Sequence, residues 1–346
     1  MYAVETIDLS RVFELKGRRI LALDGINIRI GKGEILGLLG ANGAGKTTLV
    51  KILSTLLLPT SGSAYIHGHD VVRDAKYVRG IINLVSGGET PGYGMLTVRE
   101  NLWLFSQLYG LSSGIARERI EMLIRDMGLE QYRDVRMHRL STGYRQRLNL
   151  ARGFINDPKV LFLDEPTLGL DVINAKHMRR YIRDWVDADG EERTILLTTH
   201  YLAEAEEVCD KIAIIYRGRI VAYETPLALK ASLSDGVSIQ VELLSNRTTK
   251  GSIVEEISSR DGVLACMLVP SQNVVEQGDH GGNARYDGSI DGLTRLRIML
   301  DDDSKIPDLV SMLVMNGYRV LSVRRDQPTL EDVYMRYVGS MGNEES

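Results

Sequence analysis

The sequence predicts an α/β domain built on a mainly parallel sheet, followed by a small α+β domain. Over residues 1 to about 225, short apolar runs typical of buried strands alternate with segments of helical apolar spacing. That alternation is typical of a mainly parallel sheet with helices packed on it. The order of elements changes from about residue 226. We therefore expect residues 1–225 to form the first domain, and residues 226–346 an accessory domain with a short tail.

Composition and charge narrow the class of protein. The 346 residues are 44% hydrophobic and 25% charged, as in an ordinary globular protein with a sizeable core. The net charge of −4 argues against a nucleic-acid partner, which usually requires a basic face. We find no signal peptide and no segment with the roughly 20 apolar residues that span a bilayer. We therefore expect a cytoplasmic chain, whose membrane role would come from a partner.

The elements of the first domain follow from its apolar patterns. Residues 4–30 alternate apolar and polar residues around a charged turn, as antiparallel strands with one solvated face do. EILGLLG is typical of a short buried strand. GKTTLVKILSTLL follows it, and the spacing of its apolar residues predicts a helix. Residues 97–156 are mostly helical and form a helical subdomain. Three further runs are typical of buried strands: KVLFLDEP, TILLTTH and KIAIIYRG.

The second domain has a different order of elements. SIQVELL, SIVEEISSR, GVLACMLV, TRLRIML, IPDLVSMLVMNG and RVLSVRR give strand, helix, strand, strand, helix, strand. This βαββαβ order predicts a ferredoxin-like unit. A polar, glycine-rich connection over residues 270–292 separates its two middle strands, and TLEDVYMRYVG forms a last amphipathic helix.

A phosphate-binding loop is predicted at GANGAGKT, residues 40–47, which matches G-x-x-x-x-G-K-[ST] between a buried strand and a helix. Glycines there let consecutive backbone N–H groups surround phosphate oxygens, and the helix N-terminus adds a favourable potential. We expect Lys46 to reach the β- and γ-phosphates and the Thr47 hydroxyl to bind Mg²⁺. The predicted nucleotide-binding residues are Gly40, Asn42, Gly43, Ala44, Gly45, Lys46, Thr47 and Thr48.

Two carboxylates follow the buried strand in VLFLDEP, residues 160–166. Asp164 stands at the carboxyl end of that strand, where α/β proteins bind their ligands, and is expected to hold Mg²⁺. Glu165 comes next and is the candidate general base that polarises the attacking water.

The segment LSTGYRQRLNLARG, residues 140–153, points to a family. Ser141 is typical of a helix N-cap, and with Gly143 it gives an exposed, positively polarised helix start. Together with the two preceding motifs, the segment resembles the L-S-G-G-Q signature of ATP-binding cassette (ABC) ATPases. It departs from that signature at its third and fifth places, which hold Thr142 and Tyr144. The resemblance covers residues 1 to about 225 and implies a P-loop ABC ATPase domain, with a mixed sheet core and a helical subdomain, that binds ATP and Mg²⁺.

The resemblance assigns roles to further residues. Ser141 and Gly143 would meet the γ-phosphate of ATP, and Asp171 at the end of LGLD would belong to the D-loop at the dimer interface. His200 in TTH resembles the switch histidine that contacts the γ-phosphate. Phe13 aligns with the aromatic residue that stacks on adenine.

One expected residue is missing from SGGETPGYG, residues 86–94. Most ABC ATPases carry a glutamine here that touches Mg²⁺ and senses the membrane subunit, and its place falls at about Gly88. Glu89 is the nearest polar residue. Either Glu89 binds the metal instead, or the role is vacant and the loop serves as a flexible coupling to the partner.

The family resemblance also implies partners. Each ATP is held between the phosphate loop of one ABC subunit and the signature of another, which predicts a dimer, and we expect a homodimer. The sequence around the motifs, and the segment PTLEDVYMRYVG, look like those of the ATPase subunits of ABC-2-type exporters. That group includes the multidrug, daunorubicin and sodium-efflux kinds. A separate ABC-2-type permease would then hold the chain at the inner face of the membrane. Drugs, lipids, polysaccharides and ions remain open as cargo.

Two other classes of ABC ATPase require features that can be looked for in the sequence. A nucleic-acid-handling ABC ATPase would need a long heptad-repeat insertion, and a translation factor would need two cassettes and a basic linker. Neither feature occurs in this sequence. A non-transport or regulatory ATPase, with an effector-binding C-terminal domain, stays open as the alternative.

Overall fold

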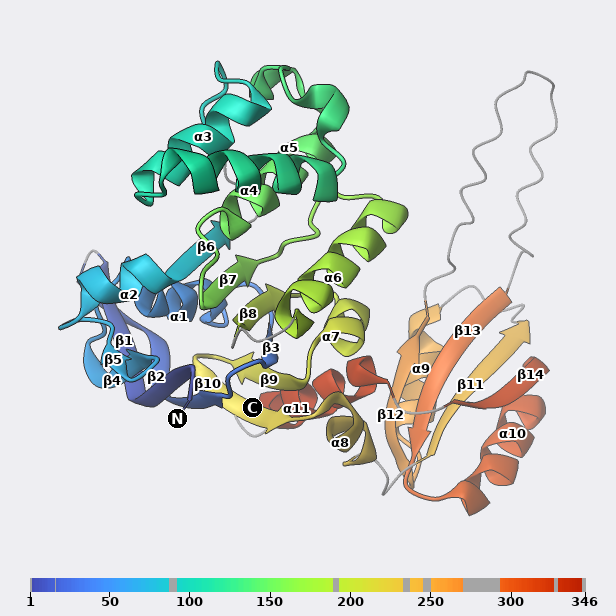
Figure 1. Cartoon of the computed structure of the whole chain (residues 1–346). Helices are drawn as coiled ribbons and strands as arrows, with labels where there is room; N and C mark the ends of the chain where they lie inside the picture. Colours follow the sequence, from blue (N-terminus) through green and yellow to red (C-terminus); the bar gives the residue numbers. More distant parts are fainter. Residues whose placement is uncertain are drawn as a thin grey trace, which may run out of the picture. The chain divides into compact units, whose positions relative to one another are not determined.

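The computed structural model describes residues 2–15, 17–86, 92–188, 193–232, 237–244, 250–269, 293–326 and 329–343. The chain divides into two compact units (Figure 1). The first comprises Met1–Pro226 together with Tyr334–Ser346, and the second comprises Leu227–Val333. Both boundaries between the units fall within helices, the first in the short helix α8 (Pro226–Ala231) and the second in α11 (Leu330–Asn343).

The first unit is built on a six-stranded mixed sheet with the order β10-β9-β3-β8-β7-β6. The pairs β9–β3, β3–β8, β8–β7 and β7–β6 are parallel, and β10 pairs antiparallel with β9. The central strands β3 and β8 are buried along their whole length, as strands covered on both faces are. The strands are β3 (Ile35–Leu39), β6 (Ile82–Ser86), β7 (Val160–Asp164), β8 (Thr194–Thr199), β9 (Lys211–Tyr216) and β10 (Arg219–Glu224).

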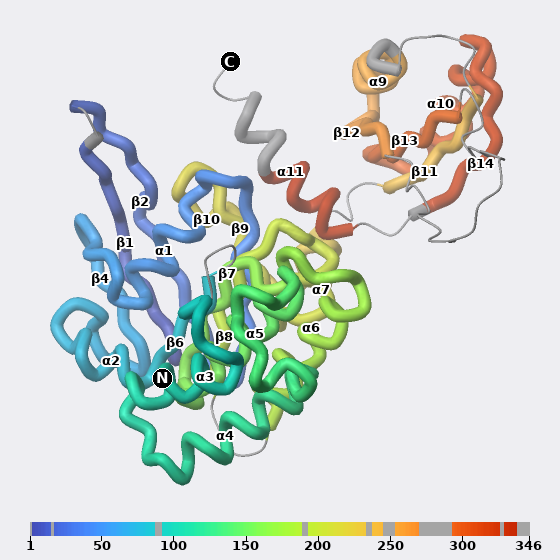
Figure 2. Tube along the Cα trace, turned by 90° about the horizontal axis from the view of Figure 1, so that it is seen from above, coloured from blue at the N-terminus to red at the C-terminus, as the bar shows by residue number. Residues whose placement is uncertain are grey.

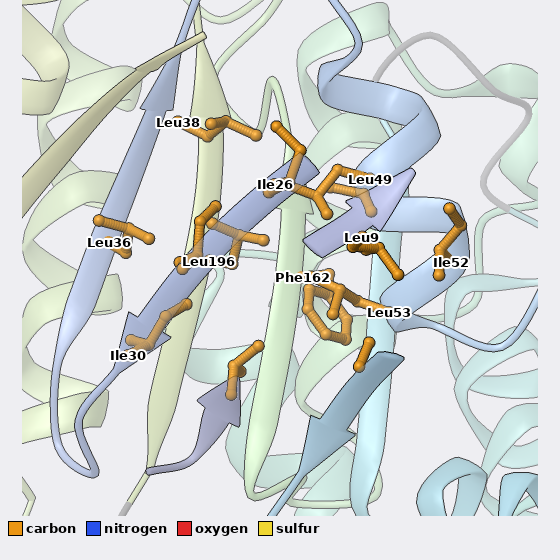
Figure 3. Packing of buried hydrophobic residues seen from close by; sticks show 14 of the residues in the cluster. Leu9, Ile26, Ile30, Leu36, Leu38, Leu49, Ile52, Leu53, Phe162 and Leu196 are labelled. Atoms are coloured by element: carbon orange, nitrogen blue, oxygen red, sulfur yellow. The ribbon is translucent and has the colours of Figure 1, made fainter. Parts of the chain in front are cut away.

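A second, antiparallel sheet contains the amino-terminal hairpin that the alternating pattern of residues 4–30 predicts. Its order is β2-β1-β4-β5, from β1 (Val4–Leu15), β2 (Arg18–Ile30), β4 (Ser61–Ile66) and β5 (His69–Asp70). The main core lies between the two sheets and the helix α1 (Lys46–Leu53) (Figure 3). Leu9 and Ile26 from the hairpin, Leu49 from α1 and Phe162 from β7 are all fully buried there. This packing fixes α1, and with it the loop that precedes it, against the sheet.

Three helices form the predicted helical subdomain, and both views show them side by side (Figures 1 and 2). They are α3 (Val98–Leu108), α4 (Ser113–Asp126) and α5 (Thr142–Phe154). α3 begins in a capping box, in which the Thr97 hydroxyl accepts the Glu100 N–H and the Glu100 carboxylate accepts the Thr97 N–H. Asn149 of α5 donates from Nδ2 to the Ser86 carbonyl at 3.0 Å, which ties α5 to the end of β6. The remaining helices of this unit are α2 (Ala75–Ile81), α6 (Val172–Asp187) and α7 (Leu202–Val208).

The second unit confirms the predicted ferredoxin-like order. Its elements are β11 (Val237–Leu244), α9 (Lys250–Ser258), β12 (Val263–Leu268), β13 (Leu293–Leu300), α10 (Ile306–Met315) and β14 (Arg319–Asp326). The strands pair antiparallel in the order β12-β13-β11-β14, the arrangement in which the two βαβ halves interleave. Val241 and Ile298 of the sheet pack with Ile257 of α9 and Leu313 of α10 in a separate core. Residues 270–292, the glycine-rich connection, lie outside the described residues.

Candidate nucleotide-binding site

The predicted phosphate-binding loop joins the end of β3 to the start of α1. Two of its glycines are required by close backbone approach. A Cβ on Gly40 would lie 2.5 Å from the Ile215 carbonyl oxygen, and a Cβ on Gly45 would lie 2.7 Å from the Ala22 carbonyl oxygen. Gly45 also has a φ of 116°, which a residue with a side chain rarely adopts. The loop can therefore keep this path only with glycine at both places.

Lys46 lies inside the curve of this loop. Its side chain is almost buried, with 6% of its surface exposed. The ammonium donates from Nζ to the Gly40 carbonyl at 2.6 Å and to the Ala41 carbonyl at 3.2 Å. Burial lowers the pKa of Lys46, while the nearby carboxylates of Glu165 and Asp164 oppose that shift. The positive charge is thus held where the loop would surround an anion.

Asp164 is the last residue of β7 and faces both the loop and the neighbouring strand. One carboxylate oxygen accepts a hydrogen bond from the Thr198 hydroxyl, and the other accepts one from the Thr47 hydroxyl at 3.4 Å. A hydroxyl and a carboxylate are the hard oxygen ligands that Mg²⁺ takes beside nucleotide phosphates. The donor set therefore fits a magnesium ion at Thr47 and Asp164, with the Asp164 carboxylate oriented by Thr198.

Glu165 and His200 meet at the ends of two adjacent parallel strands, β7 and β8. Glu165 Oε1 lies 3.0 Å from His200 Nδ1, and both side chains are partly exposed. Glu165 has a φ of 52°, a left-handed conformation that is uncommon outside glycine, and its N–H donates to the Thr198 carbonyl. Such strained backbone persists where the surrounding structure enforces it, which is typical of functional positions.

A cavity of about 250 Å³ opens between the loop and these carboxylates. Its lining residues are Ala22, Ala41, Asn42, Gly43, Gly45, Lys46, Thr47, Thr48, Asp164 and Glu165. Two contributions were not predicted from the sequence. Ala22 comes from β2, and Thr198, which orients Asp164, comes from β8. Thr198 begins the TTH segment, but its role toward Asp164 follows only from the pairing of β7 with β8. Ala22 belongs to no motif and reaches the cavity through the packing of the hairpin.

Phe13 does not line this cavity. It lies on β1, paired with Ile20 of β2, and the Arg11 guanidinium stands 4.6 Å from the centre of its ring. Such a cation over an aromatic face is a favourable contact. Glu89 and Gly88 fall outside the described residues, so their assigned roles stay predictions.

The signature residues also lie outside the cavity. Ser141 caps α5, and its hydroxyl accepts the Tyr144 N–H at 3.5 Å. Ser141 is exposed and Gly143 is half-buried. Asp171 caps α6 in the same way, accepting the Asn174 N–H at 2.9 Å, and that hydrogen bond lowers the pKa of Asp171. One chain thus presents a phosphate-binding loop and, at a different place, the exposed start of α5.

Comparison with known proteins agrees with this geometry. Residues 23–168 match the family model described as "ABC transporter". The ABC transporter ATP-binding protein NatA of Bacillus subtilis is 36% identical over 214 residues, 62% of this chain and 86% of that protein. The daunorubicin resistance ATP-binding protein DrrA2 of Streptomyces coeruleorubidus is 36% identical over 319 residues, 92% of this chain and 90% of that protein. A solved ATP-binding subunit of an ABC transporter superposes with a TM-score of 0.59 at 29% identity, covering 67% of this chain and 93% of that one.

These relatives confirm the family that the motifs indicated, and the solved subunit confirms the fold of the first unit. The cavity that holds Lys46, Thr47 and Asp164 is accordingly the candidate site for ATP in this chain. The chain belongs to the ATP-binding, ATP-hydrolysing subunits of ABC transporters.

Proposed function

We propose that the chain powers export through separate membrane subunits, by holding ATP and Mg²⁺ between two copies of itself and hydrolysing the ATP. The observation that carries this proposal is the placement of the motifs. The cavity gathers Lys46, Thr47, Asp164 and Glu165, while Ser141 and Gly143 lie outside it. A second copy would bring its own signature to the open side of the nucleotide.

In this proposal, each residue of the cavity has a defined task. The loop N–H groups and Lys46 bind the phosphates, and Thr47 with Asp164 would hold Mg²⁺, which when bound supplies positive charge against the phosphate oxygens. Glu165 accepts a proton from the attacking water and orients it. His200 contacts Glu165 Oε1 at 3.0 Å, and from the family resemblance it also meets the γ-phosphate.

The surface beside Asp171 supports a dimer. Val172 and Ile173 follow it at the start of α6 and are 83% and 72% exposed, although both are large and apolar. Adjacent exposed apolar side chains favour an interface. The start of α5 would face the second nucleotide, where its positive end stabilises a phosphate.

Sedimentation of the Glu165→Gln variant tests this dimer. Without its general base the variant should bind ATP but hydrolyse it at least about a hundredfold more slowly, so ATP and Mg²⁺ should convert it from monomer to dimer. Val172→Asp in the same background should remain monomeric while still binding ATP, because a charge would be buried at the interface. Unchanged sedimentation of Glu165→Gln with saturating ATP contradicts the proposal.

A groove of about 400 Å³ is the proposed contact with the permease. Ser86 is one of its lining residues and is the last described residue before the segment that, from the family resemblance, senses the membrane subunit. Leu56, Phe105 and Tyr109 give it an apolar lining, and Leu56 is 66% exposed. Among the described residues, no helix is long and apolar enough to cross a membrane. Because its lining is apolar and partly exposed, we assign this groove to an ABC-2-type permease, which would hold the chain at the inner face of the membrane.

The second unit is proposed as an accessory domain over about residues 226–346 that supports docking or dimer contacts. The similarity to DrrA2 extends into it, since that alignment spans 92% of this chain. The cargo is selected by the permease in this proposal, and drugs, lipids, polysaccharides and ions all remain candidates.

A further inference from the structure

A buried carboxylate is hydrogen-bonded to both chain segments that carry Glu165 and His200. Glu204, on α7, has only 3% of its surface exposed. Its Oε1 accepts a hydrogen bond from the Thr167 hydroxyl at 2.7 Å, and its Oε2 accepts one from the Thr199 hydroxyl at 2.8 Å. Burying a carboxylate is costly unless its oxygens are hydrogen-bonded, so this arrangement requires both threonines in place.

The two threonines flank the two residues assigned to hydrolysis. Thr199 immediately precedes His200, and Thr167 follows Glu165 by two residues. Glu165 Oε1 contacts His200 Nδ1 at 3.0 Å. Glu204 joins the same two chain segments through the two threonines, so the hydrogen bonds and the chain together form a closed ring at the ends of β7 and β8.

Other hydrogen bonds fix each side of this ring. The Thr199 hydroxyl, while donating to Glu204, also accepts the Tyr201 N–H at 2.9 Å, which holds the turn after His200. Gln146 of α5 donates from its buried Nε2 to the Pro166 carbonyl at 2.8 Å, which holds the turn after Glu165. The left-handed backbone of Glu165 needs such support, because an isolated chain would relax out of that conformation.

We propose that Glu204 is a positioning residue for ATP hydrolysis, which holds the turn after β7 and the end of β8 at the separation where Glu165 and His200 meet. The inference rests on the proposed function, since it needs Glu165 and His200 to act in hydrolysis. Glu204 itself lines no part of the nucleotide cavity and acts only through its two threonines.

Steady-state hydrolysis of ATP by Glu204→Ala gives the first readout. Removing the carboxylate leaves two buried hydroxyls without their acceptor, and a misplaced general base costs up to about a hundredfold. We expect kcat to fall about 10–100-fold while KM for ATP stays within about twofold, because the phosphate loop is untouched. In Glu204→Gln, the amide accepts one hydroxyl and donates to the other. This conservative variant should recover kcat to within about threefold of the wild type, and Glu206→Ala, at an exposed position of the same helix, should leave it unchanged.

A double-mutant cycle with His200→Ala decides between positioning and a general structural role. If Glu204 acts through the Glu165–His200 contact, Glu204→Ala should have little further effect on single-turnover hydrolysis once His200 is gone. An equal loss in both backgrounds, or no loss in the wild-type background, overturns the proposal. Wild-type turnover in both His200→Ala and Glu165→Gln would instead overturn the proposed function.

A second pair of variants serves if Glu204→Ala does not fold. Thr167→Val removes one hydroxyl at nearly constant volume, whereas Thr167→Ser keeps it. Thr167→Val should lower kcat in the wild-type background but not in the His200→Ala background. Thr167→Ser should retain most of the wild-type rate. Thermal unfolding and ATP binding establish that each variant is folded. Equal rates for the two threonine variants contradict the proposal.

Discussion

At the scale of single residues, Lys46 is the charge on which ATP binding depends most directly. Its ammonium is enclosed by the loop and bonded to the Gly40 and Ala41 carbonyls. Lys46→Ala should abolish measurable ATP binding, by removing the only cation among the residues that line the described cavity. Titration with a fluorescent ATP analogue measures this loss. Lys51→Ala, in the last turn of the same helix and exposed, is the matched control and should bind normally. Normal affinity in Lys46→Ala would contradict the assignment of the site.

Thr198 is the residue whose removal should affect the metal without affecting the loop. It is fully buried, and its hydroxyl donates to Asp164, the carboxylate assigned to Mg²⁺. Groups that orient a metal ligand are typically worth 10–100-fold in metal affinity. Thr198→Val should therefore raise the Mg²⁺ concentration for half-maximal ATP hydrolysis about tenfold. Thr194→Val, at the other end of the same strand and equally buried, should leave that concentration unchanged. Equal Mg²⁺ dependence in both variants would count against Thr198 as the orienting group.

The sequence predicts those site residues that lie close together along the chain. Lys46 and Thr47 belong to one loop, and Asp164 and Glu165 to one strand end, so their spacing alone indicates phosphate and metal chemistry. Thr198 and Glu204 act through pairing and packing between distant segments, which no local pattern records. The assignment of Phe13 to adenine stacking rests on its family position alone and stays a prediction, and the structure places the Arg11 guanidinium beside its ring.

At the scale of secondary-structure elements, the order of helices and strands was predictable in both units. Buried parallel strands can be recognised in the sequence as unbroken apolar runs. The ferredoxin-like unit can be recognised by its order of strand, helix, strand, strand, helix and strand. The order of the strands within the main sheet could not be predicted from the sequence. The neighbours of β3 in the sheet are β8 and β9, more than 150 residues away in sequence, and that pairing follows from packing rather than from any local signal.

The separate core of the second unit predicts an effect confined to that unit. Leu313 of α10 is fully buried between the helix and the sheet. Leu313→Ala should destabilise the second unit by about 2–5 kcal/mol, because the truncated side chain leaves a cavity. Denaturant unfolding of the full chain should show that transition shifted alone, with ATP affinity unchanged. Met315→Ala, two residues on and largely exposed, is the control and should shift nothing. A matching shift in the unfolding of both units would mean that they do not unfold independently.

At the scale of the whole molecule, the chain must combine ATP turnover with a membrane partner. Leu56 lies in the groove assigned to the permease and is well exposed, so its replacement leaves the core intact. Leu56→Asp should remove the co-purification of the permease from detergent-solubilised membranes, because a charge would have to be desolvated against the partner. ATP hydrolysis by the purified chain should be unchanged.

Ile115→Asp provides the comparison for this experiment. Ile115 is also an exposed apolar residue of the first unit, on α4, and it does not line the groove. This variant should keep the permease bound. Retention of the permease by Leu56→Asp, with the same yield as by Ile115→Asp, would place the contact elsewhere.

The hydrogen bonds between Lys46 and its own loop have a consequence for the free energy of nucleotide binding. The Gly40 and Ala41 carbonyls both accept hydrogen bonds from the ammonium, so the loop itself holds the positive charge in place. Entry of a phosphate is then an exchange of partners, in which the lysine gives up carbonyls as it gains phosphate oxygens. Because some hydrogen bonds are lost as others form, the exchange contributes less net binding free energy than the phosphate contacts alone would suggest.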